Sequence, residues 1–192
     1  LERFQDPQAA VEMMTNGSTP ISRYYFQPNV GGDYALMFGM LKHLREWDIQ
    51  ALAAGKKSVF DRSFIEMNTV GFDAMMEEID RTAWSDIHTH TGLSPEHLES
   101  LAKMYLDAKT AIFCWGMGIT QHRHGTANVH MLANLMLARG HIGRPGAGLA
   151  PIRGHSNVQG DRTMGINELP STKLLDNIDR VFGIKSPRHH GF

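Results

Sequence analysis

The change of hydrophobic period near residue 110 is the feature that most constrains the fold. Residues 110–115 form a short, mostly apolar, β-prone run that directly follows a helical pattern. A glycine-rich turn at 116–118 ends the run, and a second helical pattern extends from about residue 127 to 139, where Gly140 closes it. This order of helix, strand, glycine turn and helix predicts an α/β fold in which 110–115 is a buried strand of a parallel sheet.

The first half of the chain is predicted to be mainly helical. Asp33 stands in the capping region of a helix whose apolar side chains share one face. These apolar residues are Leu36, Met37, Met40, Leu41 and Leu44. Further helices are expected to begin near Asp61 and Phe72 and at Ser94, which Pro95 follows, whereas residues 1–30 are predicted as loop with one short helix. We therefore predict a helical part over 1–110 and a part with the strand, glycine-rich loops and helix over 111–192.

Composition excludes several classes of function. The chain has 192 residues, 42% of them hydrophobic, and a formal net charge of −1, which argues against nucleic acid as the main partner. No apolar run approaches the ~20 residues that cross a bilayer, so no membrane span is expected. The single cysteine, Cys114, excludes an internal disulfide and an iron–sulfur cluster held by this segment alone. We expect Cys114 to be a buried core residue and the protein to be cytoplasmic.

Glycine is concentrated in the second half of the chain, because ten of the 19 glycines lie between Gly116 and Gly165. Such density suits close approach of the backbone to a ligand. Residues 115–121 follow the predicted strand, at the sheet edge where ligands of α/β proteins bind. A tight structural turn is the alternative for this short motif. It lacks the third glycine of a dinucleotide fingerprint, which disfavours an NAD-dependent dehydrogenase.

Residues 140–161 are expected to be a long irregular segment. Its polar side chains of Arg, His, Ser, Asn, Gln and Asp could hold a polar ligand, and a solvated loop is the alternative. Two histidine pairs are weak evidence for a zinc site, since no further ligands follow at a suitable spacing. His88 and His90 are expected to be polar loop residues, and His122 and His124 could lie at the rim of a ligand site.

Three motifs occur in one order and spacing. They are Trp-Gly-Met-Gly-Ile-Thr-Gln at 115–121, Gly-His-Ile-Gly-Arg-Pro-Gly-Ala-Gly at 140–148 and Arg-Gly-His-Ser-Asn-Val-Gln-Gly-Asp at 153–161. Together they resemble the molybdopterin oxidoreductase family, in its formate-dehydrogenase-like branch often called YdeP-type. Gly31-Gly32-Asp33 and residues 64–72 agree with this resemblance. It implies a three-layer, parallel-sheet α/β fold, like the middle domains of formate dehydrogenase and dimethyl sulfoxide reductase, and an internal fragment of a much longer parent.

The resemblance also implies roles for individual residues. Asp33 would read a guanine, and further residues would line the cofactor. The implied cofactor-binding residues are Gly31, Gly32, Asp33, Gly116, Met117, Gly118, Gln121, Asn157 and Gln159. Arg153 would face the substrate, and His155 stands where formate dehydrogenases usually have glutamine, so both are expected on the substrate side. No residue of this segment is expected to bind the metal.

The implied function is part of an oxidoreductase that binds molybdenum or tungsten through bis-molybdopterin guanine dinucleotide. The expected partners are a small-molecule substrate, such as formate or another small anion, the rest of the parent chain and an electron-transfer partner. A 4Fe-4S cluster is expected in the parent but not in this segment. The isolated chain should be inactive. The alternative is a non-catalytic cofactor-binding or assembly module derived from the same family.

Overall fold

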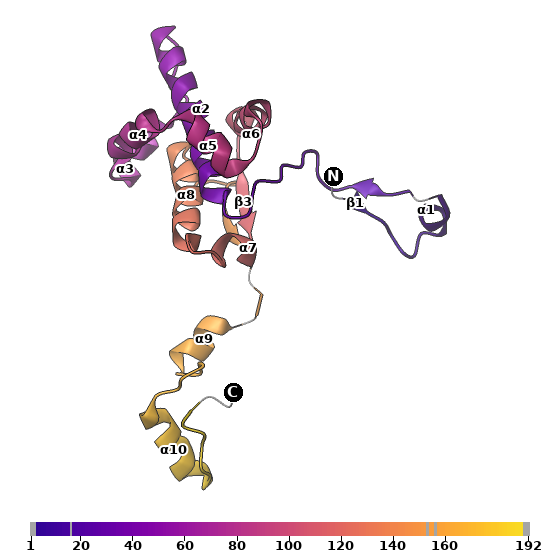
Figure 1. Cartoon of the computed structure of the whole chain (residues 1–192), viewed down its shortest axis with the longest axis vertical. Helices are drawn as coiled ribbons and strands as arrows, with labels where there is room; N and C mark the ends of the chain where they lie inside the picture. The colour runs from indigo at the N-terminus through magenta and orange to yellow at the C-terminus, as the bar shows by residue number, and fades with distance from the viewer. Residues whose placement is uncertain (1–2, 16, 153, 156, 190–192) are drawn as a thin grey trace. The chain divides into compact units, whose positions relative to one another are not determined.

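The computed structural model describes residues 3–15, 17–152, 154–155 and 157–189. These residues form two compact units, with the division between 152 and 153 (Figure 1). Unit 1 precedes this division and unit 2 follows it. The domain boundary expected at residue 110 concerns the longer parent protein and stays a prediction.

Unit 1 contains eight helices and four short strands among its described residues. The helices are α1 Ala10–Thr15, α2 Asp33–Ala53, α3 Arg62–Asn68, α4 Phe72–Arg81, α5 Trp84–Thr91, α6 Pro95–Asp107, α7 Met117–Thr120 and α8 Gly125–Ala138. The strands β1 Arg3–Phe4 and β2 Thr19–Pro20 pair antiparallel, and β3 Ile112–Trp115 pairs parallel with β4 Gly148–Pro151. The short helix expected within residues 1–30 is α1.

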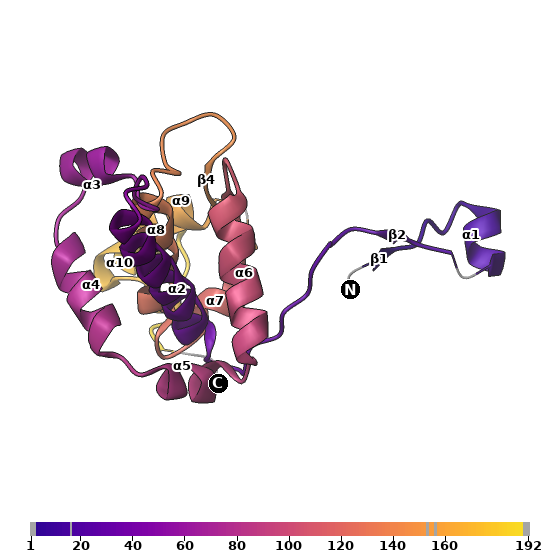
Figure 2. The ribbon, with the colours of Figure 1, turned by 90° about the horizontal axis from the view of Figure 1, so that it is seen from above.

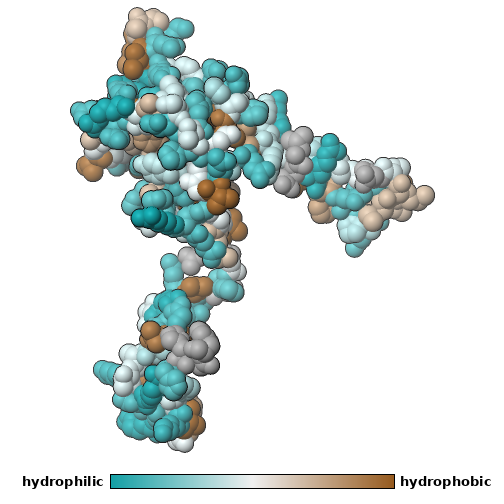
Figure 3. Space-filling view, viewed as in Figure 1, coloured by the Kyte–Doolittle hydropathy of each residue, from teal (hydrophilic) through white to brown (hydrophobic). Residues whose placement is uncertain are grey.

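Helix α2 lies at the centre of unit 1, where it contacts α4, α5, α6 and α8 (Figure 2). Its buried apolar residues are Met37, Phe38, Met40, Leu41 and Leu44, which include four of the five predicted ones. Leu36 is only partly buried. Because neighbours pack on several sides of α2, its buried surface is wider than a single stripe. Its last turns expose the apolar side chains of Ile49 and Leu52, and hydrophobic surface is visible at the top of Figure 3, where Figure 1 places one end of α2.

Three predicted helix starts are confirmed. The Asp61 carboxylate accepts a hydrogen bond from the Phe64 amide at 3.1 Å and so caps α3. The Ser94 hydroxyl accepts one from the His97 amide at 3.3 Å and caps α6, with Pro95 in the first turn. Helix α4 begins at Phe72, as expected.

Helix α5 was not predicted, and the expectation that His88 and His90 lie in a loop is wrong. Both lie in α5, whose polar sequence has little helical preference of its own. The helix forms because Ile87 is buried in the core that α2 organises. Tertiary packing thus outweighs local propensity in this segment.

Strand β3 confirms the predicted strand and its parallel pairing, but it is not buried. Ile112 is 59% exposed, and Cys114 is exposed as well, so the expectation of a buried core cysteine is wrong. Within the described residues β3 has one neighbouring strand, β4, and alternate side chains of a strand point to opposite faces. Phe113 packs against the core, whereas Ile112 and Cys114 point to the uncovered face. The three-layer arrangement is not confirmed.

Helix α8 begins at Gly125, slightly earlier than predicted, and buries a different face. The sequence pattern predicts an apolar face of Val129, Leu132, Ala133, Met136 and Leu137. Met131, Leu135 and Met136 are buried, so only Met136 belongs to both sets. Gly140 follows the helix with φ of +60°, which confirms its place at the C-terminal end. Helix α8 contacts α2, α7, α3 and β4, and these contacts decide which of its faces is buried.

The segment 140–161 is less irregular than expected. It contains β4 and the start of α9 Val158–Thr163, and unit 2 also contains α10 Thr172–Phe182. None of these elements was predicted. Strand β4 contains glycine and proline, which are rare inside strands, and only its pairing with β3 identifies it. Among the described residues, no helix has both the length and the apolar character needed to cross a membrane.

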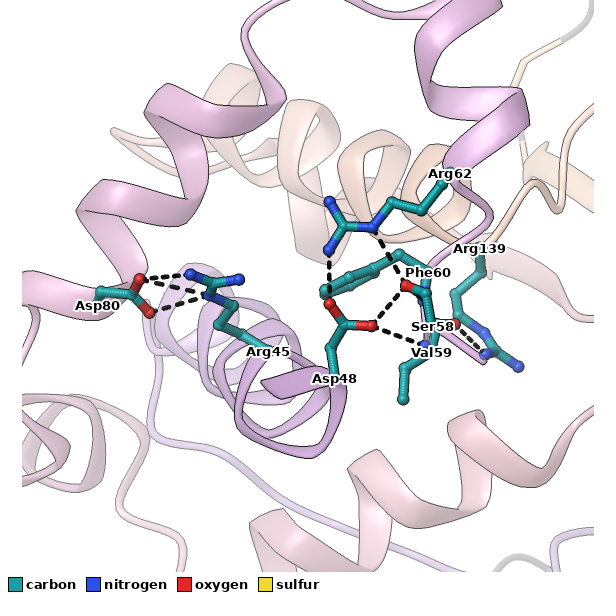
Figure 4. Close-up of polar contacts among 8 residues, drawn as sticks. All are labelled: Arg45, Asp48, Ser58, Val59, Phe60, Arg62, Asp80 and Arg139. Carbon is teal, nitrogen blue, oxygen red and sulfur yellow. Dashed lines mark hydrogen bonds and ion pairs between the residues drawn. The ribbon is translucent and has the colours of Figure 1, made fainter. Parts of the chain in front are cut away.

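A buried carboxylate joins the end of α2 to the segment before α3. The Asp48 side chain is fully buried and accepts hydrogen bonds from the Ser58 hydroxyl at 2.5 Å, the Val59 amide at 2.7 Å and the Arg62 guanidinium at 2.5 Å (Figure 4). Burial alone would raise the pKa of Asp48, but these three donors together hold the pKa below its ordinary value. A second pair, Arg45 and Asp80, joins α2 to α4 nearby.

We expect Asp48→Asn in the intact protein to lower the free energy of unfolding by about 3 kcal/mol, because it removes one partner of a buried charged pair. Since folding lowers the pKa of Asp48, its stabilisation is present above the ordinary aspartate pKa of about 3.9 and is lost as the pH falls through the folded-state value. Urea denaturation between pH 7 and pH 3 measures both effects.

Asp107→Asn is the matched control, because Asp107 lies at the end of α6 in an exposed pair with Lys103. It should change the free energy of unfolding by less than about 1 kcal/mol. Equal effects of the two substitutions, or an Asp48 variant with the same acid sensitivity as the wild type, would contradict the role given to the buried carboxylate.

Candidate functional site

The first predicted site segment is the turn that leads into α2. The Gly32 amide donates to the Asn29 carbonyl at 2.8 Å, and the Asn29 amide donates to the Thr91 carbonyl at 2.8 Å, so the turn is tied to the end of α5. A Cβ added to Gly32 would lie 2.6 Å from the His90 carbonyl oxygen. Gly32 is therefore needed for this close approach.

Asp33 does not cap α2, and this part of the expectation is wrong. The N-cap residue is Gly32, which makes no side-chain cap, and Asp33 is the first residue of the helix itself. Its carboxylate is 21% exposed. Because Asp33 already has helical geometry, its side chain extends away from the amides that a cap would satisfy. The carboxylate is thus available for another partner.

The second predicted segment, Gly116 to Gln121, follows β3 and forms the one-turn helix α7. Gly116, Met117, Gly118 and Gln121 are all exposed, at the carboxyl end of the parallel strand pair. A Cβ added to Gly116 or Gly118 would meet no atom within 4 Å. The backbone of this turn is therefore open to a ligand.

Helix α8 holds α7 in place. The Asn128 side-chain amide donates to the Ile119 carbonyl at 2.9 Å, and a Cβ at Gly125 would lie 2.2 Å from the Thr120 carbonyl oxygen. Asn128 is 1% exposed, and its Oδ1 has no partner among the described residues. Sequence reasoning missed Asn128, although a polar residue on the buried face of a helix is a usable signal.

His122 brings the two segments together. Its Nε2 lies 3.8 Å from Oδ2 of Asp33, and the two side chains are 23% and 21% exposed. The residues are far apart in sequence, so the contact arises from the packing of α2 against α8. The contact places His122 where a site formed by both segments would have its rim. The sequence indicates that His122 could lie at the rim of a ligand site, and its distance to Asp33 is consistent with that position.

A pocket of about 270 Å³ lies beside the first turns of α2. Tyr34, Phe38 and His90 are among its lining residues, and the rings of Tyr34 and Phe38 stack with centroids 6.0 Å apart. Burial, and then the charge of Glu78, raise the pKa of Tyr34, so its hydroxyl is a neutral donor at physiological pH. No local sequence pattern indicates this pocket, because its lining comes from three helices.

The remaining predicted site residues belong to unit 2. His155 and Asn157 are exposed, and Asn157 has φ of 55°, a left-handed conformation that asparagine tolerates, directly before α9. Gln159 is exposed on α9. Arg153 lies outside the described residues. The structure thus brings Asp33 close to His122 at the end of the α7 segment.

No group of three or more His, Cys, Asp or Glu side chains is placed to hold a metal ion within the part of the chain that the structure describes. The region at the carboxyl end of β3 therefore offers a ligand the exposed backbone of residues 116–121, the imidazole of His122 and the carboxylate of Asp33 from α2. It suits binding and orientation of a large polar group.

The chain is similar in sequence to several known proteins. The chain is 48% identical over 191 residues to Protein YdeP of Escherichia coli (strain K12), with all of this chain and 25% of that protein covered. It is 41% identical over 192 residues to the Uncharacterized oxidoreductase Rv2900c of Mycobacterium tuberculosis, with all of this chain and 24% of that protein covered. It is 35% identical over 148 residues to formate dehydrogenase H of Escherichia coli (strain K12), with 71% of this chain and 20% of that protein covered.

The chain thus spans about a quarter of the length of the first two relatives. Residues 55–186, more than half of the chain, match the family model described as Molybdopterin oxidoreductase. The resemblance seen in the three glycine-containing motifs is confirmed. This chain belongs to the molybdopterin oxidoreductase family.

Proposed function

We propose that the full-length protein is an oxidoreductase that binds molybdenum or tungsten through bis-molybdopterin guanine dinucleotide, and that this chain forms part of the cofactor cradle. The contact between Asp33 and His122 carries the proposal. It joins the Gly31–Asp33 turn to the segment after β3, and both match the family's cofactor motifs. When bound, the cofactor would supply the two-electron redox chemistry, while the protein binds and orients it.

The residues at this edge fit a pterin dinucleotide. Gly116 and Gly118 leave the backbone open, so its amides can donate to a ligand that approaches closely. The Asp33 carboxylate makes no helix cap and can accept two parallel hydrogen bonds from the N1–H and amino groups of a guanine. The stacked rings of Tyr34 and Phe38 offer an apolar wall to a purine in the adjacent pocket.

His122 would orient the Asp33 carboxylate. Its Nε2 lies 3.8 Å from Oδ2 of Asp33, close enough to restrict the orientation of the carboxylate that would accept from guanine. Met117 and Gln121 would line the cofactor from α7, and Asn157 and Gln159 from unit 2. These assignments rest on the family motifs, together with the exposure of each residue.

On the substrate side we propose Arg153 and His155. A guanidinium would orient a small anion through two parallel donors and stabilise developing negative charge. His155 is exposed, and its imidazole would hold or move a proton there. The substrate is formate or another small anion, and the histidine in place of the usual glutamine favours an anion of different shape.

The rest of the full-length protein would supply what this chain lacks. We propose that the metal ligand and a 4Fe-4S cluster lie in other segments, that an electron-transfer partner docks on the whole protein, and that the protein is cytoplasmic. Metal analysis of the purified full-length protein tests the proposal as a whole. Stoichiometric molybdenum or tungsten supports an oxidoreductase, whereas its absence favours a non-catalytic module.

We expect Asp33→Asn in the full-length protein to reduce bound molybdenum, because an amide cannot accept both guanine hydrogen bonds. A lost charge-assisted hydrogen bond costs about 1.5–3 kcal/mol, or roughly 10- to 100-fold in affinity. Elemental analysis after dialysis measures the occupancy, and circular dichroism confirms that the variant is folded.

Asp73→Asn is the matched control, since Asp73 is also an acidic residue in the first turn of a helix, α4, and is exposed. It should leave the molybdenum content unchanged. Wild-type molybdenum content in Asp33→Asn would refute the assignment of Asp33.

For Arg153→Ala we expect turnover to fall by about 10²–10³ while molybdenum is retained, because one charged donor to the transition state is removed. Arg153→Lys should rescue little, since an ammonium does not reproduce the planar fork. Turnover of the small anion that the wild type accepts, and metal content, are measured on the same preparation.

Arg162→Ala provides the control, because Arg162 forms an exposed ion pair with Glu168 in the same unit. Its turnover should equal that of the wild type. Parallel loss of metal and turnover in Arg153→Ala would instead show that Arg153 binds the cofactor and not the substrate.

A further inference from the structure

We propose that unit 1 carries a second ligand site, for a phosphoryl anion of the pyrophosphate type, in a basic groove at the opposite edge of the β3–β4 sheet. The groove has a volume of about 730 Å³. Residues 57–63, residues 106–109, Arg139 and Arg144 line it. The groove lies entirely within unit 1.

The direction of the strands separates this groove from the proposed cofactor edge. Lys109 precedes the first residue of β3, and Arg144 precedes the first residue of β4. Because the two strands are parallel, their starting ends share one edge of the sheet, and the turn at Gly116 lies at the other. The inference therefore does not rest on the proposed function.

The groove carries a positive charge that the protein does not neutralise. Its basic residues are Lys57, Arg62, Lys109, Arg139 and Arg144, and its acidic residues are Asp61 and Asp107, so five positive and two negative charges leave a net charge of +3. Arg62 pairs with Asp48, and Asp107 pairs with Lys103. Within the described part of the chain, no ion pair joins Lys57, Lys109, Arg139 or Arg144 to a carboxylate.

Arg139 is held in place by backbone carbonyls and forms no ion pair within the described residues, while the charges of Asp61 and Asp107 act on it from further away. Its NH1 donates to the Val59 carbonyl at 2.5 Å (Figure 4), its NH2 donates to the Leu106 carbonyl at 2.9 Å, and its Nε is buried without a described partner. Burial lowers the pKa of Arg139, so the charge carries a desolvation cost. A nearby anion would offset this cost, since carbonyl oxygens supply only partial negative charge.

The second guanidinium is fixed in a similar way. Arg144 NH2 donates to the Lys109 carbonyl at 3.1 Å and lies 3.1 Å from Nδ1 of the buried His141. Burial, and then the charges of Arg144 and Arg139, lower the pKa of His141 to about 4. The positive potential of the two guanidinium groups thus acts on a neighbouring titratable group as well as on the groove.

The arrangement of donors favours a phosphoryl group over a carboxylate. Lys57, Lys109 and the two arginines come from separate segments, so their donors approach the groove from different directions. A tetrahedral phosphoryl group accepts hydrogen bonds from several directions, and both guanidinium and ammonium groups bind it well. Two linked phosphoryl groups also match the net charge better than a single carboxylate does.

The test is isothermal titration of the full-length protein with inorganic pyrophosphate. We expect binding to weaken by about tenfold in the double variant Lys57→Gln/Lys109→Gln, since each of these exposed charges contributes up to about 1 kcal/mol. Neither lysine side chain donates a described hydrogen bond, so both substitutions should leave the fold intact. At one ligand concentration, pyrophosphate should also raise the thermal midpoint of the wild type by more than that of the double variant.

Lys56→Gln is the matched control, because Lys56 is the exposed neighbour of Lys57 and does not line the groove. It should bind pyrophosphate as the wild type does. The proposal is wrong if the full-length protein binds no pyrophosphate or if the double variant binds it as tightly as the wild type. Tighter binding of citrate than of pyrophosphate would overturn the phosphoryl assignment. Molybdenum content, measured in parallel, reports separately on the cofactor proposal.

Discussion

The close packing of α2 is the constraint on which the rest of unit 1 depends. A Cβ added to Gly39 would lie 2.6 Å from a methyl group of Leu98 on α6 and 2.8 Å from one of Ile87 on α5. Glycine at this position lets three helices approach one another, and the apolar residues on either side of it fill the core. Because an interior at this density tolerates few voids, the position of α2 determines where its neighbours lie.

The two ends of α2 serve different purposes. Asp33 begins the helix with a partly exposed carboxylate, whereas Asp48, about 22 Å further along the helix axis, is fully buried and satisfied by three donors. The same residue type therefore stabilises the fold at one end and remains available to a ligand at the other. The number of surrounding donors makes the difference, since a buried carboxylate is tolerated only when hydrogen bonds satisfy it.

The parallel pairing of β3 with β4 organises the surface of unit 1 in a comparable way. One edge of the sheet carries the exposed glycine turn beside Asp33, and the other edge carries uncompensated basic side chains. Strand direction alone creates this separation, because all starting ends of parallel strands face one way. A cofactor cradle and a distinct anion groove are thus compatible on one small unit.

Local patterns in the sequence determined much of the secondary structure and the family. Asp61 and Ser94 predict the starts of α3 and α6, because a capping side chain bonds to amides in its own helix and needs no distant partner. The apolar run at 110–115 predicts β3. The three glycine-containing motifs identify the molybdopterin oxidoreductase family. Tertiary structure alone decided the existence of β4 and α5, the exposure of Cys114 and the meeting of Asp33 with His122. Each of these depends on which surfaces pack together, and a local pattern carries no information about a neighbour that is distant in the chain.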